Sequence, residues 1–219
     1  NLTYDEGGRL NKITDFSGRS VTYIYDTNGD LLSITKPATA DFPGGATVHF
    51  SYTNHRITSI TDANGQVYLT NFYNGQGMVD VQEYNGNTIY LDYDTAGRTT
   101  EFKDPKGYRT VYTFNAAGNP LKKEQFTSGL RNNDPTSYIT TYEYNNHMEL
   151  TKVVYPKGNS ILYDYDASGN LLESRRKAPT GSTEPDIVTT FRYESRYNFI
   201  KTLRDPSDNV TTYYNDYEE

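Results

Sequence analysis

Aspartate residues recur in short turns along the chain, and regularly spaced carboxylates could hold a cation or work as acid–base pairs. The segment Asp26-Thr27-Asn28-Gly29-Asp30 is the most suggestive, because it resembles the start of a calcium-binding loop. It lacks the distal glutamate that completes the ligand set of such a loop. Asp or Asn at the first position of a turn and Gly at the fourth already have a local structural reason. We therefore interpret these aspartates as turn formers.

Other reactive residues are few. His49, His55 and His147 lie at unrelated places, and the chain has no cysteine. No G-x-S-x-G segment and no glycine-rich phosphate loop occurs in the sequence. The sequence thus predicts a protein that is not an enzyme, with no catalytic residue, no metal ligand and no cofactor.

A repeated frame positions the turns. Residues 93–114 read YDTAGRTTEFKDPKGYRTVYTF, in which an aromatic residue followed by Asp opens the unit and a glycine lies four places later. A second Asp-x-x-Gly turn, Asp104 to Gly107, lies near the middle of this unit. A unit of about 21 residues recurs, which indicates a repeat architecture. The aromatic anchors of the units are Tyr4, Tyr25, Tyr52, Tyr73, Tyr93, Phe114, Tyr144, Tyr165 and Tyr193.

Each unit contains two turns, and a turn about every ten residues predicts consecutive β-hairpins. The glycine at the end of each turn is expected to adopt positive φ, which a β-branched residue tolerates poorly. The turn after the anchor is called here the first turn, and the next one the second turn. First-turn glycines are Gly29, Gly97, Gly118 and Gly169, and second-turn glycines are Gly18, Gly65, Gly107 and Gly158.

The strand that ends at each anchor alternates with a period of two. Tyr25, Tyr23 and Val21 are an example of large residues two apart, which share one face of a strand. We expect this aromatic face to be the buried one. In the following strand the apolar residues fall six and nine places after the anchor, as at Leu31 and Ile34. This odd separation indicates either a bulge or a sheet that is partly covered on both faces.

Composition limits the partners. The chain has 22 tyrosines, 21 Lys plus Arg, 28 Asp plus Glu and a formal net charge of −7, without a basic run. Nucleic acid is therefore not expected as a partner. No segment approaches the ~20 apolar residues of a membrane span.

These features predict an all-β fold in which tandem antiparallel hairpins form one continuous curled sheet. Residues 1–219 are expected to be a single array of about nine units, a fragment of a longer protein without a second domain. Three units are longer, with Pro-, Gly- and Ser-rich loops near residues 36–47, 127–137 and 177–186. These loops could recognise a partner or fill space between neighbouring winds of a spiralling sheet. The sequence favours neither of these two roles.

The recurring motif resembles the RHS/YD repeat. It is seen in YDTNGDL, YDASGNLL, KDPKGYRTVYTF and RDPSDNVTTYY. That family includes Rhs polymorphic toxins, wall-associated bacterial proteins, the C component of Tc toxins and the teneurins. The resemblance implies a spiralling β-shell that encloses a C-terminal toxin, in a secreted or cell-surface protein.

We therefore expect a non-catalytic shell segment that encloses cargo from its own parent chain, or that packs against neighbouring winds of the shell. The alternative is a cell-surface adhesion or carbohydrate-binding array in which the tyrosine face or the long loops bind glycans.

Overall fold

The computed structural model describes residues 1–127 and 133–214, and this part of the chain is built from β-strands and turns without a helix. The predicted all-β class is confirmed. Residues 128–132 of the expected loop at 127–137 lie outside the described residues. The strands are β1 Leu2–Tyr4, β2 Leu10–Thr14, β3 Ser20–Tyr25, β4 Leu31–Thr35, β5 Thr47–Thr53, β6 Arg56–Thr61, β7 Val67–Tyr73, β8 Val79–Tyr84, β9 Asn87–Asp94, β10 Thr99–Lys103, β11 Arg109–Phe114, β12 Pro120–Phe126, β13 Ser137–Tyr144, β14 Leu150–Val154, β15 Ser160–Tyr165, β16 Leu171–Lys177, β17 Ile187–Tyr193, β18 Ile200–Arg204 and β19 Val210–Thr212.

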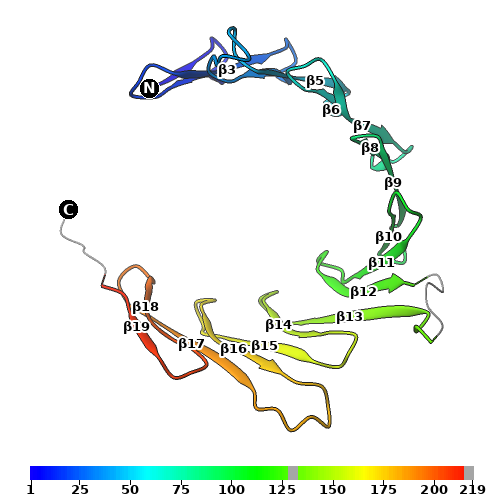
Figure 1. Ribbon diagram of the computed structural model, residues 1–219, viewed down its shortest axis with the longest axis vertical. Coiled ribbons are helices and arrows are strands. Elements are labelled where there is room, and N and C mark those ends of the chain that lie inside the picture. The colour runs from blue at the N-terminus through cyan, green and yellow to red at the C-terminus, as the bar shows by residue number, and fades with distance from the viewer. Residues whose placement is uncertain (128–132, 215–219) are drawn as a thin grey trace. The chain divides into compact units, whose positions relative to one another are not determined.

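These nineteen strands of the described chain belong to one antiparallel sheet (Figure 1). Two compact units can be distinguished within it. The first comprises residues 1–92 and 102–107, and the second comprises residues 93–101 and 108–219. Each is described by itself below. The expectation of a single array over residues 1–219, without a second domain, stays a prediction.

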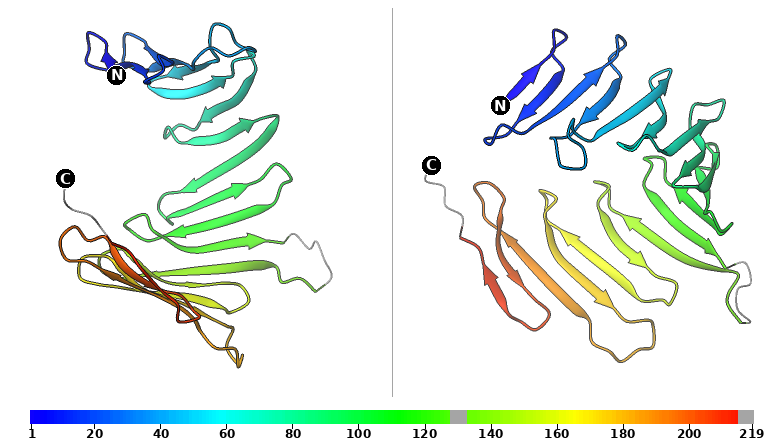
Figure 2. Two further views of the ribbon diagram at one scale, coloured as in Figure 1. Left: turned by 60° about the vertical axis from the view of Figure 1, so that its left-hand side comes forward. Right: turned by 45° about the horizontal axis from the view of Figure 1, so that its top comes forward.

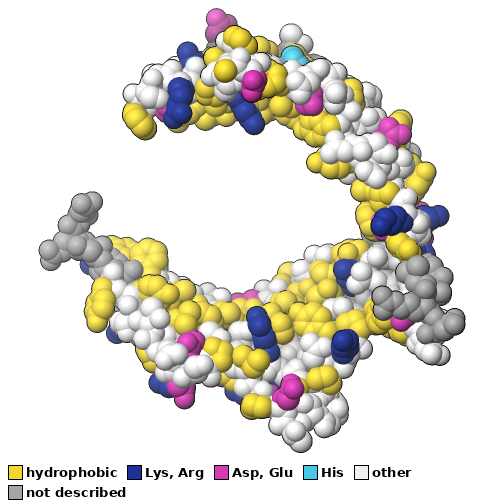
Figure 3. Space-filling model, in the orientation of Figure 1, with side chains coloured by type: hydrophobic (Ala, Val, Ile, Leu, Met, Phe, Trp, Pro, Cys, Tyr) yellow, Lys and Arg dark blue, Asp and Glu magenta, His cyan; other side chains and the backbone are white. Residues whose placement is uncertain are grey.

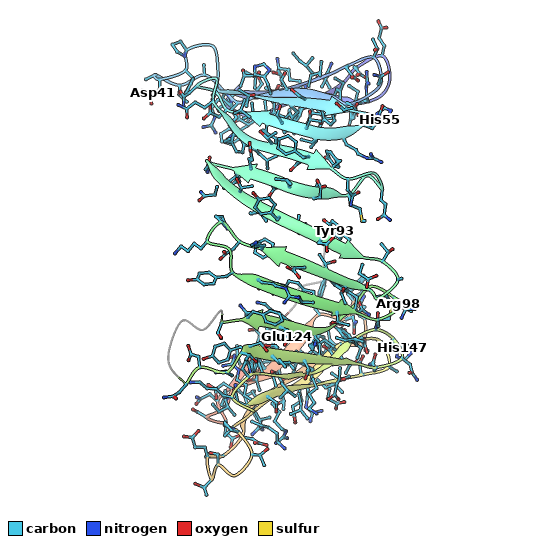
Figure 4. All side chains as sticks on the ribbon, turned by 90° about the vertical axis from the view of Figure 1, so that its right-hand side faces the viewer. Asp41, His55, Tyr93, Arg98, Glu124 and His147 are labelled. Carbon is cyan, nitrogen blue, oxygen red and sulfur yellow. The ribbon has the colours of Figure 1, made fainter. Side chains whose placement is uncertain are left out.

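Inside each unit, every strand pairs with the strand that follows it in sequence, so the hairpins lie side by side (Figure 2). First turns therefore share one border of the sheet and second turns share the other. In the first unit, His55 of a first turn and Asp41 of the loop between β4 and β5 lie at opposite borders (Figure 4). Long loops extend the second-turn border, because they connect β4 to β5 and β16 to β17.

A β-bulge at the anchor explains why the apolar residues of the next strand are separated by an odd number of positions. Tyr25 is opposite Leu31, whereas Tyr23 is opposite Ile34, and the register shifts between Ile24 and Tyr25. Directly opposed residues lie on the same face, so the bulge brings both aliphatic residues onto the aromatic face. The same register shift precedes the anchors Tyr4, Tyr52, Tyr73, Phe114, Tyr144, Tyr165 and Tyr193.

The aromatic face is less buried than expected. Val153 is the one buried hydrophobic side chain among the described residues, at 5% exposure. Eight of the nine anchors are half-buried, and Tyr4 is 58% exposed. The expectation of a buried face was wrong because no second layer packs on the described sheet, so each ring is covered by its in-sheet neighbours alone.

Within the described residues, no helix is both long enough and apolar enough to cross a membrane.

Candidate functional site

The aromatic face is the surface that consists of the anchors, the residues two and four places before them, and the aliphatic residues opposite these on the next strand. In the second unit Tyr144 lies opposite Leu150 and Tyr142 lies opposite Val153. Hydrophobic side chains form a band along the strands of this unit (Figure 3). The face can therefore pack against apolar or aromatic matter.

The hydroxyl groups of several anchors are already used within the sheet. Tyr25 donates a hydrogen bond to the carbonyl oxygen of Leu10 at 3.0 Å, and Tyr165 donates to that of Leu150 at 3.0 Å. Tyr73 donates to Ile57 at 2.6 Å, and Tyr193 donates to Leu171 at 3.1 Å. Each acceptor is the residue opposite the anchor of the preceding unit, so these bonds link successive repeats.

This role requires the phenol to stay protonated. Burial raises the pKa of Tyr144, and burial followed by the nearby Glu149 carboxylate raises that of Tyr165. Burial also raises the pKa of Tyr52, and the carboxylates of Asp30 and Asp26 raise it further. All three phenols are therefore neutral and poor nucleophiles at physiological pH, and the Tyr165 hydroxyl stays available as a hydrogen-bond donor.

Cations lie over several rings of the same face. The guanidinium carbon of Arg9 is 4.9 Å from the ring centroid of Tyr25, and that of Arg56 is 5.8 Å from the centroid of Tyr73. These distances fall within the range of cation–π attraction. Arg9 also donates to the carbonyl oxygen of Asp26 at 3.3 Å, so it joins the first turns of two successive units.

The turn aspartates accept hydrogen bonds from their own turns. Asp26 Oδ1 accepts from the backbone nitrogens of Asn28 and Asp30, both at 2.8 Å, and Asp166 does the same with Ser168 and Asn170. The Asn170 side chain is the main cause of the lowered pKa of Asp166. The Asp166 carboxylate is therefore a weak base, and the shared hydrogen bonds of both aspartates agree with a turn-forming role.

Asp15 shows the largest effect of this kind. Its pKa falls to about 2, first because the Ser17 hydroxyl donates to the carboxylate and also because Arg19 bonds to it. Asp15 Oδ2 lies 2.8 Å from Arg19 Nε. The carboxylate therefore remains ionised at any pH at which the protein is expected to work.

The turn glycines adopt positive φ with one difference from expectation. Gly29, Gly118 and Gly169 have φ of 92°, 85° and 84°, and the second-turn glycines Gly18, Gly65, Gly107 and Gly158 have φ between 81° and 85°. Gly97 stays in its turn, but positive φ falls on Arg98, at 51°. The reason is that the Gly97 backbone nitrogen donates to the Asp94 side chain at 2.8 Å, which gives this turn a different hydrogen-bond pattern.

The three histidines do not come together. His55 Nδ1 lies 2.9 Å from Asp30 Oδ1, a contact between first turns of neighbouring units. The backbone nitrogen of His147 donates to Asn145 Oδ1 at 3.0 Å, and His49 is exposed opposite Ser33. Residues 1–127 and 133–214 contain no group of three or more His, Cys, Asp and Glu side chains that could hold a metal.

The second face of the sheet is the surface opposite the aromatic one, and in the first unit it consists largely of hydroxyl groups. Thr22 is opposite Thr35, which is opposite Thr47, and the last two hydroxyl oxygens are 2.9 Å apart. Register places on this face Thr14, Ser20, Thr22, Ser33, Thr35, Thr47, Ser51, Ser59, Thr70 and Thr88.

In the second unit the same face is charged. Lys152 Nζ lies 2.8 Å from Glu143 Oε1, and Lys122 Nζ lies 2.9 Å from Glu124 Oε2. Lys122 is the main cause of the lowered pKa of Glu124, with a further contribution from Ser137. The pKa of Arg175 is raised, first by its hydrogen bond to Asp186 at 3.1 Å and then by that to Glu173 at 2.8 Å. Figure 4 shows Glu124 on the sheet, away from the border where Arg98 and His147 lie.

Known proteins support the family resemblance. The RHS repeat model matches residues 4–41 and 93–129. Residues 4–41 and 93–129 are similar to RHS repeats and make up less than half of the chain. The predicted resemblance is thereby confirmed, and the matched segments begin at the anchors Tyr4 and Tyr93.

Two curated relatives of the chain carry names of toxin or nuclease proteins. Double-stranded DNA deaminase toxin A of Burkholderia cenocepacia (strain H111) is 33% identical over 50% of this chain and 8% of its own length. The tRNA nuclease WapA of Bacillus subtilis (strain 168) is 28% identical over 66% of this chain and 5% of its own length. The chain thus spans less than a tenth of these relatives.

Two solved structures have a similar fold. A crystal structure of TcdB2-TccC3-Cdc42 matches 90% of this chain with a TM-score of 0.59 and 14% identity, over 12% of that chain. A structure of TcdB2-TccC3-TEV matches 92% with a TM-score of 0.52 and 17% identity, over 13% of that chain. Identities this low show the fold alone.

Two features of these repeats were not predicted from the sequence, although each has a signal there. The preference for Tyr over Phe at eight of nine anchors was a signal for the hydroxyl bonds between repeats. Charged residues two apart, as at Lys122 and Glu124 or at Glu173 and Arg175, were a signal for the charged second face.

Proposed function

We propose that the chain is a non-catalytic structural segment of an RHS-repeat shell, and that it contributes wall to a β-capsule around a toxin or other cargo of the same parent protein. The observation that carries the proposal is the linkage of successive hairpins by anchor hydroxyls while both faces stay partly exposed. Such a sheet holds together strand by strand and leaves its faces free to meet contents or a neighbouring wind.

The twist of the β-sheet supports the enclosure of a cargo. Open antiparallel sheets of more than ~10 strands curl or split because twist accumulates from strand to strand. Further repeats on either side would continue the ribbon and wind it around a space. The toxin and nuclease names of the relatives support a toxin as the cargo. We infer from the same resemblance that the parent protein is secreted or displayed on the cell surface.

Limited proteolysis of the intact protein tests enclosure. We expect segments outside the repeats to resist cleavage in the wild type and to be cut rapidly in a Gly118→Val, Gly169→Val variant, whose hairpins are destabilised. Lys152→Gln is the matched control, because it changes a surface charge without disturbing a turn. The capsule would be contradicted if, in the wild-type protein, the segments outside the repeats were cleaved as fast as the same segments expressed alone.

A glycan-binding array is the second candidate, favoured by rings that are open to solvent. Tyr90 is 51% exposed and Tyr138 is 41% exposed. Exposed rings can stack on sugars, although the hydroxyls of Tyr25, Tyr73, Tyr165 and Tyr193 are already engaged. Saturable oligosaccharide binding by the intact protein that is lost in Tyr90→Ala and Tyr138→Ala, together with unprotected cargo, would favour this function over the shell.

A further inference from the structure

A groove of about 430 Å³ lies on the second face of the first unit. Its lining includes Ser20, Thr22 and Thr35 of the sheet, Arg19 after the second turn between β2 and β3, and Lys36 at the start of the loop between β4 and β5. This volume falls within the range of about 300 to 1,000 Å³ that is common for small-molecule sites. Sheet, turn and loop thus form three sides of one recess.

Hydrogen bonds hold the loop that forms one wall of this groove. The Lys36 backbone nitrogen donates to the Ala46 carbonyl oxygen at 3.0 Å, and that of Gly45 donates to Phe42 at 2.9 Å. Gly45 has φ of 91°, and a Cβ atom there would collide with the Lys36 carbonyl oxygen. Asp41, at the far end of this loop, projects away from the sheet (Figure 4). The wall is therefore formed before any ligand arrives.

Positive charge gathers at this groove although the whole chain carries a formal net charge of −7. The Arg19 side chain is 68% exposed, and its Nε bonds to Asp15 while its two terminal nitrogens make no hydrogen bond to the described residues. Neither Lys36 nor Lys12, which lies opposite Thr22, forms an ion pair with any residue of 1–127 or 133–214. The two cations of the lining, Arg19 and Lys36, against the single carboxylate of Asp15 leave a local charge of about +1, and Lys12 lies on the neighbouring strand outside the lining.

We propose that this groove binds the phosphate group of a phosphate ester. A phosphate monoester carries about −1.5 to −2 charges at pH 7 and three acceptor oxygens. Arg19 and Lys36 would neutralise that charge from two walls, since both residue types bind phosphate well. The hydroxyls of Ser20, Thr22 and Thr35 would donate to the remaining oxygens from the floor. A planar carboxylate offers fewer acceptors and less charge to the same donors.

A groove of nearly equal size in the second unit has the opposite character. It measures about 420 Å³, and its charged lining residues are Glu143, Asp164, Glu173, Lys152 and Arg175. Lys152 and Arg175 are both engaged in ion pairs there. With three acids against two bases this groove should reject anions, so it is a built-in control for general surface charge.

Phosphorus NMR of glycerol 3-phosphate, titrated with the intact protein, tests the proposal independently of the shell function. We expect saturable line broadening for the wild type, and an apparent Kd raised roughly tenfold in Lys36→Gln and in Arg19→Gln. Lys152→Gln should bind like the wild type. Circular dichroism should show an unchanged fold for all three variants, because each changed side chain is partly or largely exposed.

Three results would overturn the assignment. The first is the absence of saturable broadening in the wild type at low ionic strength. The second is an equal loss of binding in Lys152→Gln, which would indicate general attraction to surface cations. The third is equal or tighter binding of glucuronate, measured by competition, which would mean that the groove selects carboxylates. Inorganic phosphate that competes with glycerol 3-phosphate would support recognition of the phosphate group itself.

Discussion

The second faces of the two units have different chemistry although the units share one repeat frame. In the first unit this face is a field of serine and threonine hydroxyls, exemplified by Thr22, Thr35 and Thr47. In the second unit it carries ion pairs, exemplified by Glu143 with Lys152 and Glu173 with Arg175. Anchors, bulges and turns are common to both units. The aromatic face and the turns therefore maintain the sheet in both units. The second face can vary between units, and so can what it binds.

The turns give the largest expected effect, and it should be equal in both units. Gly29→Val in the first unit and Gly118→Val in the second should each cost about 1 to 3 kcal/mol of stability, because a β-branched residue is strained at positive φ. Native-state hydrogen exchange would measure the loss in each hairpin. Gly44→Val is the control, since Gly44 lacks positive φ and a Cβ atom there meets nothing within 4 Å. Equal exchange rates in wild type and both turn variants would contradict the shared frame.

Gly97→Val distinguishes two causes of destabilisation, which are backbone strain at positive φ and a steric collision of the added side chain. Its φ is not positive, but an added Cβ atom would collide with the Asp94 carboxylate. We therefore expect a cost that falls when Asp94 is also changed to Ala, whereas the cost of Gly118→Val should not change with Asn115→Ala.

The anchor hydroxyls come next in size. Tyr25→Phe and Tyr165→Phe should each lower the free energy of unfolding of their hairpin by about 1 kcal/mol, because a half-buried carbonyl oxygen loses its donor. Tyr163→Phe is the matched control on the same strand as Tyr165. Exchange protection of the preceding hairpin should fall in the two anchor variants. An effect of equal size in Tyr163→Phe would remove the special role of the anchor hydroxyl.

Salt should act on the units differently and more weakly. Each exposed ion pair of the second unit contributes at most about 1 kcal/mol, and sodium chloride screens it. Raising the salt concentration should therefore reduce hydrogen-exchange protection of β14 to β16 relative to β3 to β5. Glu143→Gln with Lys152→Gln should abolish part of that difference. Equal salt dependence of the two sets of strands would show that the contrast between the faces has no energetic consequence.

The smallest effect is a pH dependence confined to the first unit. The pKa of His55 is raised, first by its hydrogen bond to Asp30 and then by the charges of Asp30 and Asp26. A raised pKa means that protonation favours the folded turn: the stabilisation is complete below the ordinary pKa of 6.5 and is lost as pH rises through the folded value. The difference in melting temperature between wild type and His55→Gln should therefore shrink from pH 5.5 to pH 8.5. A difference that grows over this range would exclude the ion pair with Asp30.

The repeat length, the hairpins and the positions of most turns could be predicted from the amino-acid sequence, because they depend on local preferences. Asp26 and Gly29 specify a turn from their own backbone and side-chain chemistry, and Tyr23 and Tyr25 share a face because a strand alternates. After Tyr52 the apolar residues Ile57 and Ile60 come five and eight places later, one place earlier than the usual six and nine, because the hydrophobic pattern follows the strand. This shift could also be predicted from the sequence. The register of the bulge could not be predicted from the sequence, because it depends on how two strands pair.

The contacts between successive repeats became visible in the three-dimensional structure alone. That Tyr25 reaches Leu10 and that Arg19 and Lys36 line one groove both depend on residues far apart in the sequence. Positive φ on Arg98 in place of Gly97 instead follows a hydrogen bond within one turn, from the Gly97 backbone nitrogen to Asp94. The degree of burial of the aromatic rings is also a property of the tertiary structure, because it depends on whether a second layer covers them. Local chemistry selects a hairpin, but the position of neighbouring hairpins determines which side chains meet.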